Sequence, residues 1–320
     1  MLPIAAIVLA LIAVTPVHAQ EAYPAKTLRM VVPYAPGGPI DVWGRILIQK
    51  LTEGFGHAAI VDNRPGANGI VGSDLVAKSP ADGYTFLYQT GSHAANPYIY
   101  KKLPYDSVRD FQPITQMAST HGMVLVVHPS VPAKSLKEFI ALSKSRPGKL
   151  NYASAGAGNA THLAAEMMKA AAGLDIVHVS YKGGGPALND VIAGQVETMM
   201  VSVAQGAPFV KAGKVRALAI TAANRAPPLP NIPTFQESGF RGFDFAGWHG
   251  LWFPAGVAKD RLARMHKEVA RIMFAPEIKP RLDELGLVPL ASSPTEFTKF
   301  IEREMALYAK LIRAAKIEPQ

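Results

Sequence analysis

Apolar and polar positions along this chain follow two patterns, short apolar runs and longer repeats at helical spacing. Residues 28–33 form an apolar run suited to a buried strand, and the sequence PGGP at 36–39 must turn the backbone. After the turn, apolar residues recur at helical spacing, at Ile40, Trp43, Leu47 and Leu51. The pattern predicts a strand, a glycine turn and an amphipathic helix that ends near Gly54.

Similar units recur along the chain. Further strands are expected at 59–62, 84–89, 123–127, 150–154, 176–180, 196–201 and 215–221. Further helices are expected up to Lys78 and at 135–143, 163–172, 187–193, 208–212, 259–274, 276–285 and 294–315. Residues 98–111 have the polar and aromatic composition of a loop. The alternation of strands and helices predicts an α/β fold in two lobes, the chain crossing before residue 123 and returning after 225–233.

The first 19 residues differ from the rest of the chain. They contain no charged residue, carry an apolar run over 4–14, and end Val17-His18-Ala19, a small-x-small cleavage pattern. We expect residues 1–19 to be a signal peptide. They lack a basic beginning, and an uncleaved anchor is the alternative. No later segment is long and apolar enough to cross a bilayer, so the mature protein is expected to be soluble.

Composition excludes several classes of function. The 320 residues are 49% hydrophobic, which rules out general disorder, and the absence of cysteine excludes disulfides, thiolate metal sites and cysteine nucleophiles. The net charge of +9 is spread along the chain, which disfavours nucleic-acid binding and leaves a mild preference for anions. No metalloprotease or phosphate-loop motif occurs, and the histidines lack metal spacing. We therefore expect no metal and no cofactor.

Two glycine turns are the candidate binding chemistry. The turn at 36–41 precedes a helix and leaves backbone N–H groups unshielded by side chains, which suits a carboxylate; an ordinary strand-to-helix turn is the alternative. The turn at 154–162 repeats this arrangement, and Ser154, Asn159 and Thr161 add side-chain donors. Two such turns facing each other could hold one carboxylate.

Other candidates follow from strand ends and aromatic residues. Ser92 and His93 follow a predicted strand, where open α/β sheets place the ligand crevice, although a satisfied hydroxyl and a packed imidazole are equally open interpretations. The aromatic stretch 243–253 is expected to bring Trp248 and His249 beside the cleft. Ser154 does not fit a nucleophile elbow, because Tyr152 stands where the first glycine is required.

Eight motifs together resemble those of the Bug family, the extracytoplasmic solute-binding proteins of tripartite tricarboxylate transporters. They occur in order and at compatible spacing over nearly the whole mature chain. They are PYAPGGPID at 33–41, NRPGA at 63–67, DGYT at 82–85, LPYD at 103–106, GAGNATHL at 156–163, YKG at 181–183, GQV at 194–196 and KAGKVRALA at 211–219.

The resemblance implies a two-lobed, periplasmic-binding-protein-like fold, hinged like a Venus flytrap, with lobe I formed by 20–122 plus 243–320 and lobe II by 123–242. It also implies a carboxylate held between two loops, a monomer in the periplasm, and permease subunits as partners. The expected ligand-binding residues are Tyr34, Gly37, Gly38, Pro39, Ile40, Asp41, Ser92, Ser154, Ala155, Gly156, Gly158, Asn159, Thr161, His162, Lys182, Val201, Ser202, Trp248 and His249. His162 is expected to orient its loop.

One departure from the family pattern bears on the ligand. Many relatives carry an acidic residue at the place of Val201, where it can meet the amino group of an amino acid. Here the position is apolar. We hypothesise a ligand without an ammonium group, such as a dicarboxylate or an aromatic acid, with Trp43, Met200 or Trp248 forming an apolar wall. The alternative is that Val201 only packs.

Three functions are compared. The leading one is a binding protein that captures a small carboxylate and delivers it to a permease. A ligand-sensing protein that feeds a sensor kinase would use the same cleft. A secreted serine hydrolase based on Ser154 or Ser92 is the remote alternative, because the elbow glycine is missing.

Overall fold

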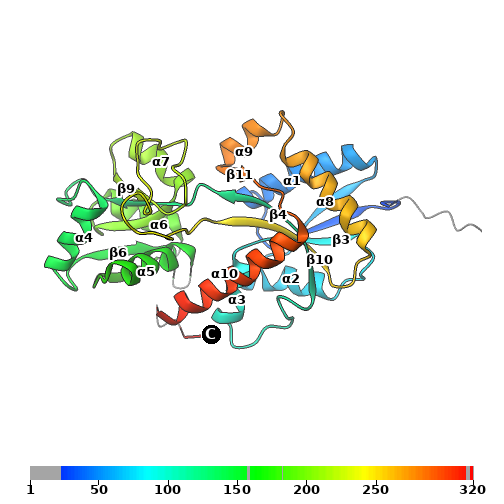
Figure 1. Ribbon diagram of the computed structural model, residues 1–320, viewed down its shortest axis with the longest axis horizontal. Coiled ribbons are helices and arrows are strands. Elements are labelled where there is room, and N and C mark those ends of the chain that lie inside the picture. Colours follow the sequence, from blue (N-terminus) through cyan, green and yellow to red (C-terminus); the bar gives the residue numbers. More distant parts are fainter. Residues whose placement is uncertain (1–22, 157–158, 182, 315–317, 320) are drawn as a thin grey trace, which may run out of the picture.

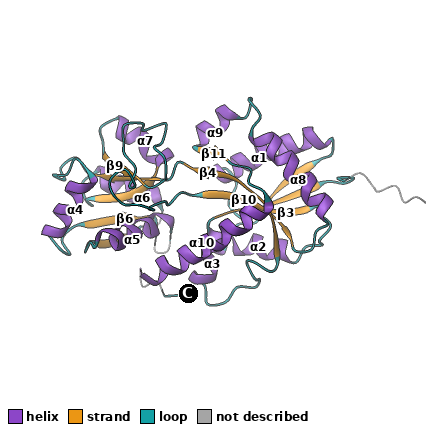
Figure 2. Cartoon of the chain, viewed as in Figure 1, coloured by secondary structure: helices purple, strands orange, loops and turns teal. Residues whose placement is uncertain are grey.

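Two mixed β-sheets divide the chain into two α/β lobes (Figures 1 and 2). The structure is a computed structural model that describes residues 23–156, 159–181, 183–314 and 318–319. The expected signal peptide lies outside these residues. None of the helices in the described ranges combines the length and apolar character that a membrane span requires.

The sheet of lobe I has the strand order β11-β4-β10-β3-β1-β2. Its strands are β1 (Leu28–Val32), β2 (Ala59–Asn63), β3 (Thr85–Thr90), β4 (Phe111–Thr120), β10 (Trp248–Pro254) and β11 (Leu287–Pro289). β1 is parallel to β2 and β3, whereas β10 is antiparallel to β3 and β4. The helices are α1 (Pro39–Phe55), α2 (Ile70–Ala77) after the 3-10 turn η1 (Ala67–Gly69), α3 (Ser92–Ile99), α8 (Lys259–Met273), α9 (Lys279–Leu285) and α10 (Pro294–Ala314).

The sheet of lobe II has the order β7-β6-β8-β5-β9. Its strands are β5 (Met123–Val127), β6 (Asn151–Ser154), β7 (Val177–Ser180), β8 (Thr198–Ser202) and β9 (Arg216–Ile220). β6 is parallel to β7 and β8, and β5 is antiparallel to β8 and β9. The helices are α4 (Leu136–Ser145), α5 (Ala160–Ala172), α6 (Gly184–Ile192) and α7 (Val203–Lys211).

Helix α1 forms as its apolar spacing predicts but is longer than expected. Trp43, Leu47 and Leu51 are fully buried, so the repeated apolar positions face the core. The helix continues through Gly54 to Phe55 and is capped by Gly56, which adopts a left-handed conformation with φ 69°. Gly54 serves packing instead, because a Cβ there would collide with the side chain of Glu268 on α8.

Several elements depart from the expected pattern. Helix α3 and strand β4 were not expected, and both contain a proline, which is unfavourable in the interior of either element. Strand β4 lies between β10 and β11 and is packed against both α8 and α10, so it buries polar residues as well as apolar ones and shows no simple alternation. Strands β10 and β11 are also absent from the expected pattern, and α7 begins five residues earlier than the predicted 208–212.

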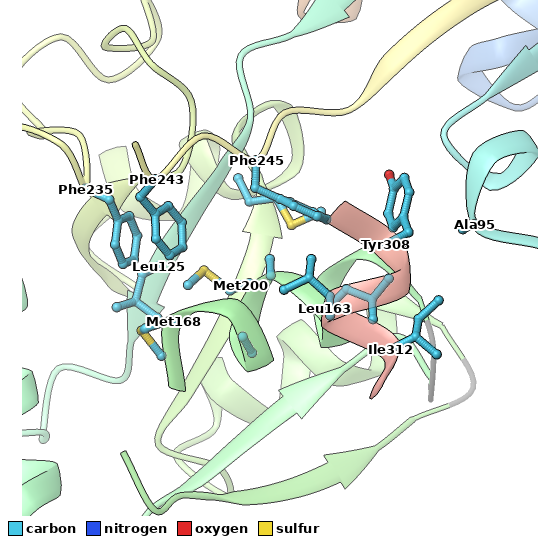
Figure 3. Close-up of a cluster of buried hydrophobic side chains, with 14 of the residues drawn as sticks. Ala95, Leu125, Leu163, Met168, Met200, Phe235, Phe243, Phe245, Tyr308 and Ile312 are labelled. Atoms are coloured by element: carbon cyan, nitrogen blue, oxygen red, sulfur yellow. The ribbon is translucent and has the colours of Figure 1, made fainter. Parts of the chain in front are cut away.

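The chain passes between the lobes twice, from β4 to β5 and from β9 to β10, and α10 forms a third connection. Helix α10 packs against α3 of lobe I and α5 of lobe II. In Figure 3, Tyr308 and Ile312 of α10 lie beside Leu163 of α5. These side chains belong to one buried cluster that extends through both lobes. The relative position of the lobes is therefore stabilised by apolar packing as well as by the two chain crossings.

Candidate functional site

A cavity of about 530 Å³ lies between the two lobes. Lobe I contributes residues around β3 and α3, lobe II contributes the turn before α5, and the returning chain contributes residues 245–249. Tyr308 of α10 completes the lining. A concave site of this size, built at the boundary between two lobes, is the usual place for a small ligand.

The lobe I wall is a cluster of hydroxyl groups. The Tyr34 hydroxyl oxygen lies 2.8 Å from Thr90 Oγ1 and 2.9 Å from Ser92 Oγ. Behind them, the fully buried side chain of Gln89 accepts a hydrogen bond from the Tyr34 hydroxyl. Burial raises the pKa of Tyr34, so its phenol is neutral at pH 7. This wall is polar and uncharged.

The lobe II wall is the turn that leads into α5. Gly156 has φ 135°, a conformation that favours glycine, and it lines the cavity together with Ala155, Asn159 and Ala160. Asn159 caps α5 by accepting a 3.0 Å hydrogen bond from the Thr161 N–H. The N-terminal end of α5 therefore faces the cavity, where the helix dipole favours an anion.

Two of the backbone N–H groups that were expected to face a ligand in this turn are already hydrogen-bonded within the turn. The Ala155 N–H donates to Thr161 Oγ1 at 2.9 Å, and the Gly156 N–H donates to Ser154 Oγ at 3.1 Å. The expectation that small residues leave all of these amides open to a ligand is thus wrong for these two, because short polar side chains of the same loop reach back to them.

The returning chain supplies two aromatic residues. Trp248 is 1% exposed and donates from its indole to Glu304 of α10, and His249 Nδ1 lies 2.6 Å from the Tyr88 hydroxyl. Burial lowers the pKa of His249 to about 4, so its imidazole is neutral at pH 7. Both residues line the cavity. Among the described lining residues, no side chain carries a formal charge at neutral pH.

The structure does not place most of the first glycine turn at the cavity. Asp41 is 2% exposed, and its carboxylate accepts hydrogen bonds of 2.9 Å from the Gly37 N–H, from Arg45 and from Asn63. Burial would raise the pKa of Asp41, but Arg45, Gly37 and Asn63 hold it below its ordinary value. The side chain of Asp41 thereby folds the turn back on itself.

The consequence for the expected binding residues is specific. Tyr34 reaches the cavity, while the residues after it in this segment, Gly37, Gly38, Ile40 and Asp41, are not part of the lining. The backbone of Pro39 begins α1. The two glycine turns therefore do not meet across the cavity through their amides in the way the sequence suggests.

Three further candidates support the lobe II turn from behind. Ser154 is fully buried, and its Oγ lies 2.6 Å from His178 Nε2. His162 stacks on His178, with ring centroids 4.0 Å apart. Burial, the largest cause, and the neighbouring His178 lower the pKa of His162 to about 4. Neither Ser154, Thr161 nor His162 lines the cavity, so a nucleophilic role for Ser154 has no geometric support.

The remaining candidates lie in the core, at a helix cap or outside the described residues. Val201 is fully buried in the lobe II core, so it packs there and does not face a ligand in the cavity. Ser202 caps α7 by accepting from the Gln205 N–H. Trp43 and Met200 are also in the core and form no cavity wall, whereas Trp248 does. Gly158 and Lys182 lie outside the described residues.

His93 is a packed imidazole in the core and does not line the cavity. It is fully buried, its Nε2 lies 2.8 Å from the Ser107 carbonyl oxygen, and burial lowers its pKa to about 4. Ser92, by contrast, lines the cavity from the start of α3.

Sequence reasoning missed several residues of the site. Asn68 and Phe245 line the cavity, and Gln89 holds its hydroxyl cluster from behind. Gln89 is the last buried residue of β3. A polar residue at the buried end of a strand could have indicated the ligand site from the sequence. Tyr308 is brought in by α10, and no local pattern could indicate that it reaches the cavity.

Comparison with known proteins identifies the family. The family model for the tripartite tricarboxylate transporter family receptor matches residues 44–317. The chain is similar to a solved structure of R. palustris Rpa4515 with adipate, at 32% identity and a TM-score of 0.78, covering 93% of this chain and 100% of that one.

Two more solved structures agree. One is the periplasmic binding protein BugD, at 32% identity and a TM-score of 0.74, covering 93% of this chain and 100% of that one. The other is MatC from Rhodopseudomonas palustris with bound malate, at 29% identity and a TM-score of 0.72, covering 91% and 100%. Together with the two-lobed α/β fold and its inter-lobe cavity, these matches mean that the chain belongs to the Bug family of tripartite tricarboxylate transporter receptors, which are solute-binding proteins and not enzymes.

Proposed function

We propose that this protein captures a small carboxylate in the cavity between its lobes and delivers it to the permease subunits of a tripartite tricarboxylate transporter. The observation that carries the proposal is the cavity itself, which joins neutral hydroxyl groups of lobe I to the N-terminal end of α5 in lobe II. The positive end of the α5 dipole and its backbone N–H groups stabilise an anion without a paired cation, and the hydroxyl groups of lobe I add neutral polar contacts. The protein works in the periplasm after removal of residues 1–19.

The ligand class we propose is a dicarboxylate or an aromatic carboxylate in preference to an amino acid. The described lining contains no carboxylate that would pair with an ammonium group, and burying an unpaired ammonium is costly. Phe245, Tyr100 and Trp248 provide apolar surface for the body of the ligand. The adipate of Rpa4515 and the malate of MatC are small dicarboxylates, which supports this class.

The mechanism we propose is closure of the lobes on the ligand. Lobe I is formed by 20–122 plus 243–320 and lobe II by 123–242, so the hinge lies at the two crossings. A ligand that contacts both walls stabilises the closed state through contacts that the open state lacks. The closed state is then what the permease recognises.

A thermal-shift screen against carboxylic acids tests the proposal, with calorimetry for each hit. A ligand that binds the native state raises the melting temperature by mass action, by an amount that grows with its concentration over Kd. Stabilisation by a dicarboxylate or an aromatic acid is the expected result. Tight binding of aspartate alone would overturn the ligand class, and no response to any carboxylate would overturn the capture role.

A further inference from the structure

The side chain of Gln89 organises the lobe I wall without lining the cavity. The Gln89 side chain is fully buried, and its amide lies behind the hydroxyl cluster. Its Oε1 accepts the Tyr34 hydroxyl proton and the Thr90 N–H at 2.8 Å, and it lies 3.0 Å from Ser92 Oγ. Tyr34, Thr90 and Ser92 all line the cavity, so one amide oxygen contacts three lining residues.

The orientation of this amide is set by the backbone. The Thr90 N–H can only donate, so the atom of Gln89 that faces it must be the oxygen. Gly69, with φ 88°, packs against the other side of the amide, where a Cβ would collide with Gln89 Nε2. The amide is therefore held between β3 and Gly69 with Oε1 toward the cavity lining.

This orientation decides what the hydroxyl groups offer a ligand. The cluster contains four oxygen atoms, on Gln89, Tyr34, Thr90 and Ser92. Four protons are shared among them: the three hydroxyl protons of the cluster and the proton of the Thr90 N–H. The Tyr34 proton goes to Gln89, and both Thr90 and Ser92 have an acceptor within 2.9 Å, the Tyr34 oxygen. Each oxygen carries about two lone pairs; those of Gln89 and Tyr34 are used inside the cluster, so the unused capacity of the wall is acceptor capacity on Thr90 and Ser92.

The two walls of the cavity thus have opposite preferences. The N-terminal end of α5 favours an anionic group at the lobe II wall. The lobe I wall favours a hydrogen-bond donor, and a neutral donor fits it better than an ammonium group because the described lining has no counter-charge.

We propose that the ligand is a hydroxycarboxylate whose carboxylate faces α5 and whose hydroxyl donates to Thr90 or Ser92 of the lobe I wall, with Gln89 as the positioning residue that sets this preference. The inference rests on the proposed carboxylate capture and narrows it to one class of ligand. An acid that lacks the hydroxyl leaves the acceptors of this wall unpaired, which is the larger cost in a desolvated site.

Calorimetry with matched ligand pairs tests the ligand class. The pairs are malate with succinate and 4-hydroxybenzoate with benzoate, which differ only by the hydroxyl group. In each pair that binds, the hydroxylated acid is expected to bind about tenfold more tightly. Equal affinities within the pairs would overturn this inference and leave carboxylate capture intact, whereas no binding of any of the four acids would overturn both.

Two variants test the role of Gln89. Gln89→Leu removes the acceptor of the Tyr34 proton, so the cluster has a hydrogen-bond donor to offer the cavity and the affinity ratio within a pair falls toward one. Because the Thr90 N–H then loses its partner and the fold is weakened, Ser92→Ala is the second variant; it keeps that bond, removes one acceptor from the wall and is also expected to lower the ratio.

The control is Ser143→Ala, which removes another hydroxyl that is hydrogen-bonded inside the protein, here to the Phe139 carbonyl oxygen of α4. It lies outside the cavity lining and is expected to change thermal stability without changing the ratio. An unchanged ratio in both Gln89→Leu and Ser92→Ala would show that the wall does not select the hydroxyl, and it would overturn the role given to Gln89.

Discussion

The indole Nε1 of Trp248 donates a 2.7 Å hydrogen bond to Glu304 Oε2, which joins the start of β10 to α10 beside the cavity. Trp248 lines the cavity, so Glu304 is one side chain away from a bound ligand. Burial raises the pKa of Glu304 to about 7, against the opposing effect of the Trp248 hydrogen bond and with a further contribution from Asp244. This carboxyl therefore changes its charge near neutral pH.

The first prediction concerns Glu304→Gln. The pKa of about 7 in the folded protein lies above the ordinary value of 4.5, so the stabilisation from this proton is complete below pH 4.5 and is lost as pH rises through 7. The variant keeps a neutral side chain throughout. Its stability relative to the wild type should rise by about 1–3 kcal/mol between pH 5 and pH 8.

Thermal or denaturant unfolding at a series of pH values measures this difference. Glu302→Gln is the control, since Glu302 lies on the same helix and is exposed. A difference between Glu304→Gln and the wild type that stays constant from pH 5 to pH 8 would mean that Glu304 titrates normally.

The second prediction concerns Asp41→Ala. Loss of this carboxylate leaves the Gly37 N–H without its acceptor and removes one of the two acceptors of Asn63 Nδ2, so the free energy of unfolding should fall by about 1–3 kcal/mol. Arg45→Ala is the matched control; it removes the half-exposed ion-pair partner and should cost about 1 kcal/mol or less. Denaturant unfolding gives both values. Full stability combined with lost ligand binding would instead place Asp41 at the ligand.

The third prediction uses tryptophan fluorescence. Of the three tryptophans, Trp248 lines the cavity, whereas Trp43 and Trp252 are fully buried and outside its lining. Ligand binding should therefore change the emission of Trp248. Trp43→Phe should keep the ligand-dependent change and Trp248→Phe should abolish it, as measured by titration with a carboxylate that thermal shift has identified. A signal that survives in Trp248→Phe would show that the ligand binds elsewhere.

Helices whose caps and apolar spacing lie within their own segment of sequence could largely be predicted from the sequence. Helix α5 stops before Gly173 as expected, with φ 63° at that glycine, and begins after Asn159, whose side chain caps it, three residues before the expected start. Both signals lie within the helix and its immediate flanks. The same holds for the apolar face of α1, where Trp43, Leu47 and Leu51 repeat at helical spacing.

The site was harder to predict because its geometry depends on partners that are distant in sequence. The amides of the first turn are oriented by Asp41, but Asp41 is held by Asn63, 22 residues later. Tyr308 reaches the cavity only because α10 crosses both lobes. Strand β4 is packed against both α8 and α10, and burial by these distant helices hides the alternation that would reveal the strand. In each case tertiary contacts outweigh the local pattern.

The last prediction concerns α10 as a connection between the lobes. Ile312 is 3% exposed and lies beside Leu163 of α5, so Ile312→Ala removes apolar packing between lobe I and lobe II (Figure 3). Ile301→Ala is the matched control, because it truncates a 5% exposed isoleucine in the first half of the same helix. Both variants should lose about 2–5 kcal/mol of stability.

Small-angle scattering separates the two variants. Without ligand, Ile312→Ala should have a larger radius of gyration than the wild type, because the lobes lose a contact that holds them together, and saturating ligand should restore the compact form by bridging both walls. Ile301→Ala should keep wild-type dimensions. Equal dimensions for both variants and the wild type, with and without ligand, would mean that α10 does not restrain the lobes and that the ligand does not close them.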